Sequence, residues 1–135
     1  MIVDTSALLA FFDSAEPRHS AVAAAVDAAE GPLVVPPYVV AELDYLLLTR
    51  HGTHVEQVVL EELGSGAWEL ATMDRDRLRA AARIVRTYAD VPIGLTDASC
   101  IVLAEAYKDP VVATLDHRHF QILRFPDGTA PTLVP

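Results

Sequence analysis

Short apolar runs alternate with segments of helical periodicity along this chain, and single acids directly follow the first and the last of the clear runs. Residues 1–3 (MIV) precede Asp4, and residues 111–115 (VVATL) precede Asp116. A buried carboxylate is costly unless it has a hydrogen-bonding partner or a bound cation. Asp4 therefore either caps the helix that follows it or binds a ligand, and Asp116 repeats the arrangement near the other end of the chain.

The alternation predicts an α/β fold with a central, mostly parallel sheet flanked by helices on both faces. The expected strands are residues 1–3, 33–36, 68–71, 111–115 and, before a proline-bearing tail, 121–125. The expected helices are residues 6–12, 18–29, 37–51, 55–63, 75–89 and 97–107. Thr53 with Glu56 predicts a capping box for the fourth helix, and Asp74 and Thr96 are the expected caps of the last two.

The composition fits one domain over residues 1–135. Hydrophobic residues make up 52% of the chain, which is enough for a single core. No apolar stretch reaches the roughly 18 residues that a membrane span needs, and no basic segment precedes an apolar one at the N-terminus, so a soluble, cytoplasmic protein is expected. The single cysteine, Cys100, excludes an internal disulfide or a thiolate metal cluster, and its apolar neighbours predict a small buried side chain.

The net charge of −9 has the wrong sign for a nucleic-acid-binding protein, because Lys and Arg supply the phosphate contacts. The objection weakens if the acids gather at a cation site, since the bound ion adds positive charge. It also weakens because the basic residues are clustered. Residues 75–86 contain five arginines and one acid, a local charge of +4 against −13 for the rest. On a helix these arginines form a stripe, which is more often a solvated face than an RNA-binding surface.

Four acids lie at comparable junctions. Asp4 and Asp116 follow strands, while Asp97 stands in the first turn of its helix and Glu42 about one turn into its own. All four are expected to converge at the carboxyl ends of the strands, where such sheets bind ligands. Carboxylates without thiolates favour hard divalent cations, and Mg²⁺ or Mn²⁺ fits better than Zn²⁺. Hydroxyl groups that flank the acids are expected to orient them: Thr5, Ser6, Thr96 and Ser99.

Four motifs carry a family resemblance: MIVDTSA (1–7), VAEL (40–43), LTDAS (95–99) and VATLDHRHF (112–120). Together they resemble PIN-domain ribonucleases and, more closely, the VapC toxins of bacterial toxin–antitoxin pairs. The resemblance covers almost the whole chain, with the motifs in the family's order and at its spacing. It implies a PIN-like three-layer α/β/α domain. It also implies that the family's acidic quartet falls on Asp4, Glu42, Asp97 and Asp116, with Thr5 or Ser6 as the hydroxyl neighbour.

The activity that the resemblance implies is that of a Mg²⁺- or Mn²⁺-dependent endoribonuclease that cuts structured RNA such as tRNA or a ribosomal RNA loop. The implied biological role is the toxin of a type II toxin–antitoxin pair. This role implies a homodimer, and a larger complex in which the C-terminal segment of a VapB antitoxin enters the active-site groove. Candidate RNA contacts are Arg118, which lies near the acids in sequence, and Arg79 and Arg83 of the arginine stripe.

Several of these residues also have a purely structural interpretation. Asp97 at a helix start complements the helix dipole, and Asp116 can cap the turn before His119. The spacing of His117 and His119 is poor for shared metal ligation, which favours surface or RNA-contact roles for both. An apolar set on the fourth helix and its neighbours either packs in the core or binds the antitoxin or a second subunit; it comprises Val58, Val59 and Leu63.

Two other classes of protein remain open on the residues alone. A non-catalytic interaction module would use the acids to bind a metal for stability. A phosphoryl-transfer domain of the receiver or phosphatase type also has an Asp after the first strand of a doubly wound sheet. That class needs a well-placed lysine and usually paired acids, whereas the only lysine here is Lys108 and no acid follows Asp4 before Asp13.

Overall fold

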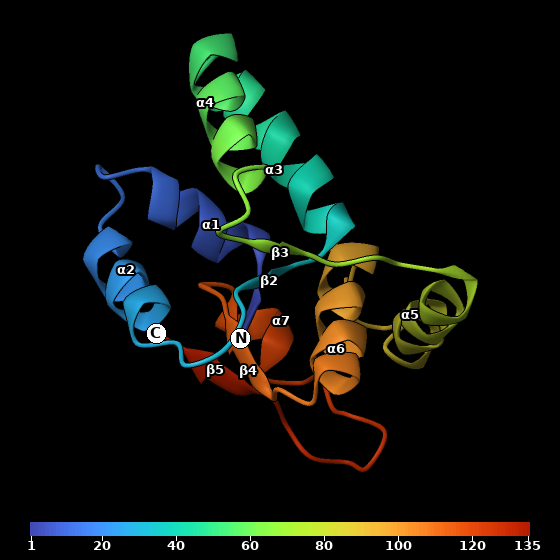
Figure 1. Cartoon of the computed structure of the whole chain (residues 1–135). Helices are drawn as coiled ribbons and strands as arrows, with labels where there is room; N and C mark the ends of the chain where they lie inside the picture. The colour runs from blue at the N-terminus through green and yellow to red at the C-terminus, as the bar shows by residue number, and fades with distance from the viewer.

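Five short parallel strands form the central sheet of the computed structural model, which describes residues 1–135 (Figure 1). They are β1 (Ile2–Val3), β2 (Val34–Val35), β3 (Glu69–Leu70), β4 (Val111–Ala113) and β5 (Thr132–Val134). Their order across the sheet is β3-β2-β1-β4-β5, and every neighbouring pair is parallel. The strand order changes direction between β1 and β4, which is the position where open α/β sheets bind their ligands.

Seven helices connect and cover the strands. They are α1 (Thr5–Phe12), α2 (His19–Asp27), α3 (Pro37–Arg50), α4 (Thr53–Leu63), α5 (Arg75–Thr87), α6 (Leu95–Tyr107) and α7 (His117–Phe120). Figure 1 shows α1 and α2 on one side of the sheet and α5 and α6 on the other. This arrangement confirms the predicted α/β/α layers. Helices α3 and α4 pack against each other and extend as a pair beyond the sheet.

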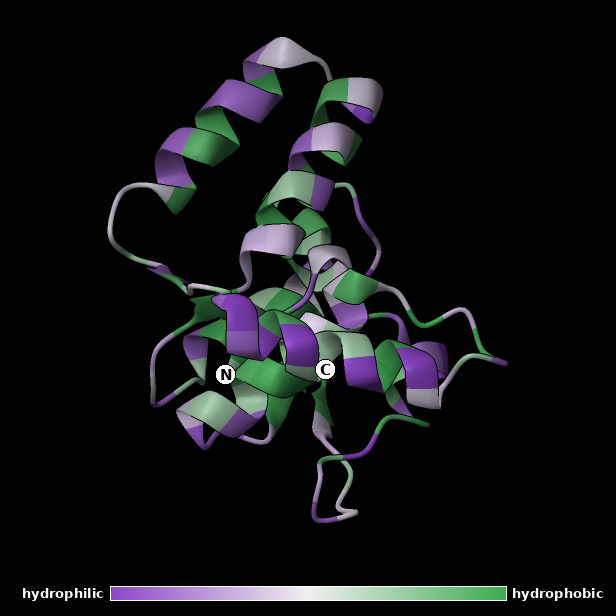
Figure 2. Cartoon of the chain, turned by 90° about the vertical axis from the view of Figure 1, so that its right-hand side faces the viewer, coloured by the Kyte–Doolittle hydropathy of each residue, from purple (hydrophilic) through white to green (hydrophobic).

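The core lies on both faces of the sheet, as a parallel sheet between two helical layers requires. Six strand residues are completely inaccessible to solvent: Ile2, Val3, Val34, Val35, Val112 and Ala113. In Figure 2 the hydrophobic residues gather around the strands, whereas the α3–α4 pair carries polar and apolar residues along its whole length. Burial of this extent accounts for the near-continuous apolar runs in the strand sequences.

Helix α6 is the most deeply buried of the seven, because it packs on β1 and β4 and also against α5. Every residue from Ala98 to Ala104 is buried. Small side chains allow the close approach of α5, since Ala81 packs against Ala98 and Val102 in a separate small cluster. The rigid placement of α6 matters for function because its first turn carries Asp97.

Two predicted helix caps were wrong. Helix α4 begins at Thr53 itself and is preceded by Gly52 as N-cap, so no capping box with Glu56 forms. Gly52 has φ +86° and ψ 171°, a conformation that turns the chain sharply from α3 into α4 and is nearly restricted to glycine. Helix α6 begins at Leu95 rather than after Thr96, with Gly94 as its N-cap.

The predicted strand at residues 121–125 was also wrong. Leu123 is fully buried and Ile122 and Phe125 are half-buried, so their apolar pattern reflects packing of an irregular segment against the core. The proline-bearing tail supplies the fifth strand instead, and β5 pairs in parallel with β4 through Val112 and Leu133. Strand β4 ends at Ala113, three residues before Asp116, where residues 111–115 had been expected to form one strand.

The apolar set expected on α4 divides between core and surface. Val59 and Leu63 are 3% and 2% exposed and belong to the core, whereas Val58 is 53% exposed.

Cys100 is fully buried, as predicted. None of the helices combines the length and the apolar character that a membrane crossing requires.

The α3–α4 turn provides a direct stability test. We expect Gly52→Ala to lower the free energy of unfolding by about 1–3 kcal/mol, because alanine is strained at this φ and ψ. No heavy atom lies within 4 Å of the added Cβ, so the loss would come from the backbone alone. Thr53→Ala should change stability by less than about 0.5 kcal/mol, because Thr53 is exposed and its hydroxyl accepts no capping hydrogen bond. Urea denaturation of both variants measures the difference; a larger loss for Thr53→Ala would restore the capping-box prediction.

Candidate functional site

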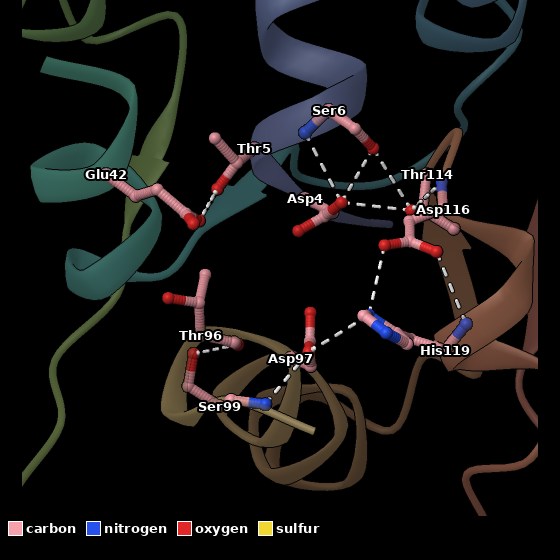
Figure 3. A network of polar contacts seen from close by, with 11 residues as sticks. Asp4, Thr5, Ser6, Glu42, Thr96, Asp97, Ser99, Thr114, Asp116 and His119 are labelled. Atoms are coloured by element: carbon pink, nitrogen blue, oxygen red, sulfur yellow. Dashed lines mark hydrogen bonds and ion pairs between the residues drawn. The ribbon is translucent and has the colours of Figure 1, made fainter. Parts of the chain in front are cut away.

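The four acids singled out in the sequence line one cavity of about 220 Å³ at the carboxyl ends of the strands. Asp4 directly follows β1, Glu42 lies on α3, Asp97 lies in the first turn of α6, and Asp116 is the N-cap of α7. Figure 3 shows these side chains arranged around a common space. Four separate elements therefore deliver one carboxylate each to the same place.

Asp4 owes its position to the pairing of β1 with β4. The Asp4 amide donates to the Ala113 carbonyl at 2.9 Å, which extends the ladder and brings Thr114 alongside. One carboxylate oxygen, Asp4 Oδ2, then accepts from Thr114 Oγ1 at 2.9 Å, from Ser6 Oγ at 2.7 Å and from the Ser6 amide at 3.3 Å. The other oxygen, Oδ1, points into the space between the acids (Figure 3).

The first turn of α6 holds Asp97 in a similar way. Asp97 Oδ2 accepts from the Gly94 amide at 3.1 Å, which fixes the side chain across the helix N-terminus and leaves its second oxygen directed toward Asp4 in Figure 3. The two interpretations of Asp97 are therefore compatible, because one oxygen caps the helix while the other faces the cavity. The same holds for Asp4, whose Oδ2 caps α1 through the Ser6 amide.

Glu42 and Asp116 complete the ring, and each has its own polar partner. Thr5 Oγ1 donates to Glu42 Oε2 at 2.6 Å, so α1 orients a side chain of α3. His119 Nδ1 lies 3.0 Å from Asp116 Oδ2 and 3.7 Å from Asp97 Oδ2. The His119 amide also donates to Asp116 Oδ1 at 3.3 Å. The imidazole thus lies between two of the acids, which come from elements α6 and α7.

Burial raises the pKa values of two of the four acids. It is the main reason that the pKa of Asp4 is raised above the ordinary value of 3.8, because the hydrogen bonds from Ser6 and Thr114 only partly oppose it. Burial also raises the pKa of Asp97, and the charges of Asp4 and Asp116 add to the increase. The Gly94 amide and His119 act in the opposite direction. Two of the four carboxylates are therefore easier to protonate than free acids, mainly because they are buried.

Cys100 lies close enough to the acids to be affected by them but does not join the site. Complete burial raises the pKa of its thiol well above the ordinary value, and the negative charges of Asp4, Asp97 and Glu42 raise it further. The side chain is therefore a protonated core thiol under physiological conditions. Since only a thiolate is a nucleophile or a strong metal ligand, Cys100 takes no part in the chemistry of the site.

The four predicted hydroxyl groups have different positions. Thr5 and Ser6 contact acids directly, as expected. Ser99 does not, because its hydroxyl donates to the Thr96 carbonyl at 2.6 Å. Thr96 makes no side-chain hydrogen bond and does not line the cavity. The hydroxyl that the sequence prediction missed is Thr114, which is completely buried beside Asp4 and also accepts from the Asp116 amide at 3.0 Å.

The candidate RNA contacts are scattered. Arg118 is exposed on α7, next to the residues that hold Asp116. Arg79 lies 3.5 Å from Asp76 within α5, and Arg83 lines a separate cavity between α5, α6 and the segment after α7. The one basic residue that lines the acidic cavity is Arg50, at the end of α3. Sequence analysis did not single it out, although its spacing of eight residues from Glu42 places both on one helix face.

Comparison with known proteins agrees with this geometry. The PIN domain family matches residues 1–125 of the chain. Ribonuclease VapC26 of Mycobacterium tuberculosis is 53% identical over 135 residues, covering all of both proteins. The chain is a VapC-type PIN-domain protein.

Solved structures share the fold of this PIN-domain protein at low sequence identity. VapC20 of Mycobacterium tuberculosis, described as a sarcin-ricin loop cleaving toxin, has a TM-score of 0.78 at 16% identity and covers 85% of this chain and 88% of its own. VapBC2 from Rickettsia felis, bound to a DNA fragment from its promoter, has a TM-score of 0.71 at 15% identity, with 99% and 98% covered. A toxin–antitoxin complex from Klebsiella pneumoniae has a TM-score of 0.70 at 16% identity and 98% coverage of both chains.

The donor atoms of this PIN domain suit a hard divalent cation. Carboxylate oxygens are the ligands that Mg²⁺ and Mn²⁺ prefer, and both Asp4 and Asp97 direct an oxygen into the cavity. No group of three His, Cys, Asp or Glu side chains is close enough to hold one ion by itself. Mg²⁺ does not need such a group, because it commonly keeps several waters and binds through one or two carboxylates. The residues therefore fit a partly hydrated ion.

The raised pKa values lead to a prediction about stability. In metal-free protein, a group with a raised native pKa stabilises the fold below its unfolded pKa and loses that contribution as pH rises through the native value. Asp4→Asn keeps an oxygen for Ser6 and Thr114 but removes the charge. We expect the melting temperature of Asp4→Asn to rise relative to the parent protein as pH increases from about 4 to 7. Thermal melts in chelator measure this difference, and a constant or shrinking difference would contradict the electrostatic interpretation.

The position of His119 leads to a second prediction. The amide of Asn places its terminal atoms near the position of Nδ1, whereas the amide of Gln reaches the position of Nε2. Because Nδ1 faces Asp116 and Asp97, we expect His119→Asn to retain most of the Mn²⁺ affinity and His119→Gln to lose about 10-fold or more. Calorimetric titration with Mn²⁺ measures both, and exposed His54→Gln on α4 is the matched control. Equal losses for Asn and Gln would show that the Nδ1 contact is unimportant.

Proposed function

We propose that this protein is the toxin of a type II toxin–antitoxin pair and acts as a Mg²⁺- or Mn²⁺-dependent endoribonuclease on structured RNA. The single observation that carries the proposal is the convergence of four carboxylates from four elements on one cavity. The 53% identity with Ribonuclease VapC26 over the full length supports RNA as the substrate class. The solved VapC20 structure, described as that of a sarcin-ricin loop cleaving toxin, supports an RNA loop as the kind of target.

In this proposal Asp4, Glu42 and Asp97 hold the ion, and Asp116 completes the site or holds a second ion. A bound divalent ion supplies an activated water and stabilises the leaving oxygen of an in-line displacement. The remaining work belongs to the residues around the acids. Ser6 and Thr114 fix one oxygen of Asp4 so that the other stays directed into the cavity.

Two further contacts orient the other acids before substrate arrives. Thr5 fixes Glu42, and His119 fixes Asp116 relative to Asp97. Each contact reduces the reorganisation that ligands would otherwise undergo when the ion and the RNA bind. These orienting groups are hydroxyls and an imidazole. No lysine or arginine among them pairs with the acids and takes the position of the ion.

The proposed partners are a VapB-like antitoxin and a second copy of this chain, which together form a larger complex. Antitoxin-bound neighbours such as VapBC2 from Rickettsia felis support this assignment. The exposed apolar residues of the α3–α4 pair are the surface we expect partners to cover. They are Tyr45, Leu48, Val58 and Leu60, which are between 37% and 66% exposed.

The phosphoryl-transfer alternative has less support from the arrangement of charges. That chemistry needs a lysine near the acid that follows the first strand, and Lys108 stands at the opposite end of α6 from Asp97. Lys108 comes eleven positions after Asp97, which corresponds to a rise of about 17 Å along the helix. The non-catalytic alternative differs from the proposal only in activity, so the decisive experiment has to measure cleavage.

We expect purified protein to cleave bulk tRNA or ribosomal RNA in Mg²⁺ or Mn²⁺ and to be inactive in excess chelator. Asp4→Asn should lower the cleavage rate by at least about 100-fold, because the loss of a ligand removes several kcal/mol of transition-state stabilisation. Asp44→Asn is the matched control, since Asp44 lies on α3 with Glu42 but does not line the cavity.

The measurement is the initial rate together with the mapped ends of the products, with circular dichroism to establish folding. Full activity of Asp4→Asn, or activity in chelator, would refute the metal-dependent mechanism. Folded protein that binds metal and cleaves no RNA would instead favour the interaction module.

A further inference from the structure

Arg50 is the one cation among the residues that line the acidic cavity. It is exposed, and it makes no ion pair or side-chain hydrogen bond, although several carboxylates line the same space. An arginine in such surroundings ordinarily pairs with one of the acids. The five donors of the Arg50 guanidinium are therefore free for a ligand that enters the cavity.

The position of Arg50 follows from the geometry of α3. Glu42, Leu46 and Arg50 are four residues apart and all line the cavity, so they form one stripe along two turns of the helix. The rise from Glu42 to Arg50 is about 12 Å. The acids therefore occupy one end of the stripe, and Arg50 lies at the other, where the α3–α4 pair extends away from the sheet (Figure 1).

The charge of the acids opposes an anionic ligand unless a cation offsets it. Four carboxylates contribute −4, and one divalent ion would leave −2 beside an incoming phosphodiester. A polyanion that enters needs a compensating cation close to the acids but away from the ion itself. Arginine is suited to this because its planar fork matches phosphate oxygens.

We propose that Arg50 binds an RNA phosphate next to the one held at the acids, and so aligns the strand along α3. This inference rests on the proposed function, because it requires RNA as the substrate. Arg50 also stands in the last turn of α3, where any cation complements the helix dipole. A dipole role alone would affect stability and would leave RNA binding unchanged, so the two roles are separable.

The test measures RNA binding in an Asp4→Asn background, which keeps the RNA intact. The probe is a short, fluorescently labelled single-stranded oligoribonucleotide, titrated at several salt concentrations. Arg50→Gln should weaken binding about 10-fold and lower the slope of log K against log salt by about 0.7, the value for one phosphate contact on a single strand. Arg50→Lys should restore the slope but only part of the affinity, because lysine acts as a point charge.

Lys108→Gln is the matched control, since it removes the same charge at the far end of α6. It should leave affinity and salt slope unchanged, and melting curves should show that all variants are folded. The proposal is overturned if Arg50→Gln binds RNA with the same slope as the parent, which would leave the residue to the helix dipole or to a protein partner. It is also overturned if Lys108→Gln loses as much as Arg50→Gln.

Failure of the proposed function would look different. In that case Asp4→Asn would still cleave RNA, or the parent protein would cleave in chelator, whatever the behaviour of Arg50→Gln. With the metal-dependent activity established, the parent background adds a second readout. Arg50→Gln should raise KM about 10-fold with a smaller change in kcat, because the contact is to a phosphate away from the reacting one.

Discussion

The parallel pairing of β1 with β4 is the constraint on which the site depends. It aligns Ile2 with Val112 and Val3 with Ala113, so the next residue of each strand, Asp4 and Thr114, must lie side by side. The Thr114 hydroxyl then bonds both the Asp4 carboxylate and the Asp116 amide. A slip of one residue would turn these side chains to opposite faces of the sheet. The register of two strands thus sets the distance between two of the acids.

The polar contacts orient the acids without neutralising them. Asp4 accepts three hydrogen bonds on one oxygen, yet burial still raises its pKa above the ordinary value. An arginine or lysine in the place of Ser6 and Thr114 would stabilise the carboxylate more, but it would cancel the charge that a cation needs. Hydroxyl donors keep the oxygen fixed and the charge intact. The stability given up at such a site is typical of positions where charge is held ready for a ligand.

The sequence predicted that the four acids would converge, and they line one cavity. For Asp4 and Asp116 this follows from topology. Strands that run parallel end at the same edge, so Asp4 and Asp116 had to approach each other. It predicted side-chain partners poorly, since Thr114 contacts an acid 110 residues away and shows no local pattern. His119 and Arg50 could have been predicted as neighbours of the acids from their spacing in the sequence. The first stands three residues after its cap, Asp116, and the second lies two turns after Glu42 on one helix face.

Net charge was the strongest sequence argument against an RNA-binding role. The argument is weak because charges far from the cavity are screened by salt. At physiological ionic strength, charges farther apart than about 8 Å are largely screened. A phosphate at the acids responds to the four carboxylates and to any ion between them, and the next phosphate of the strand responds to Arg50, while acids on distant surfaces contribute little. The arginine stripe on α5 is subject to the same limit, because Arg79 and Arg83 do not line the cavity. The local set of charges, rather than the total of −9, decides which ligand this pole of the sheet accepts.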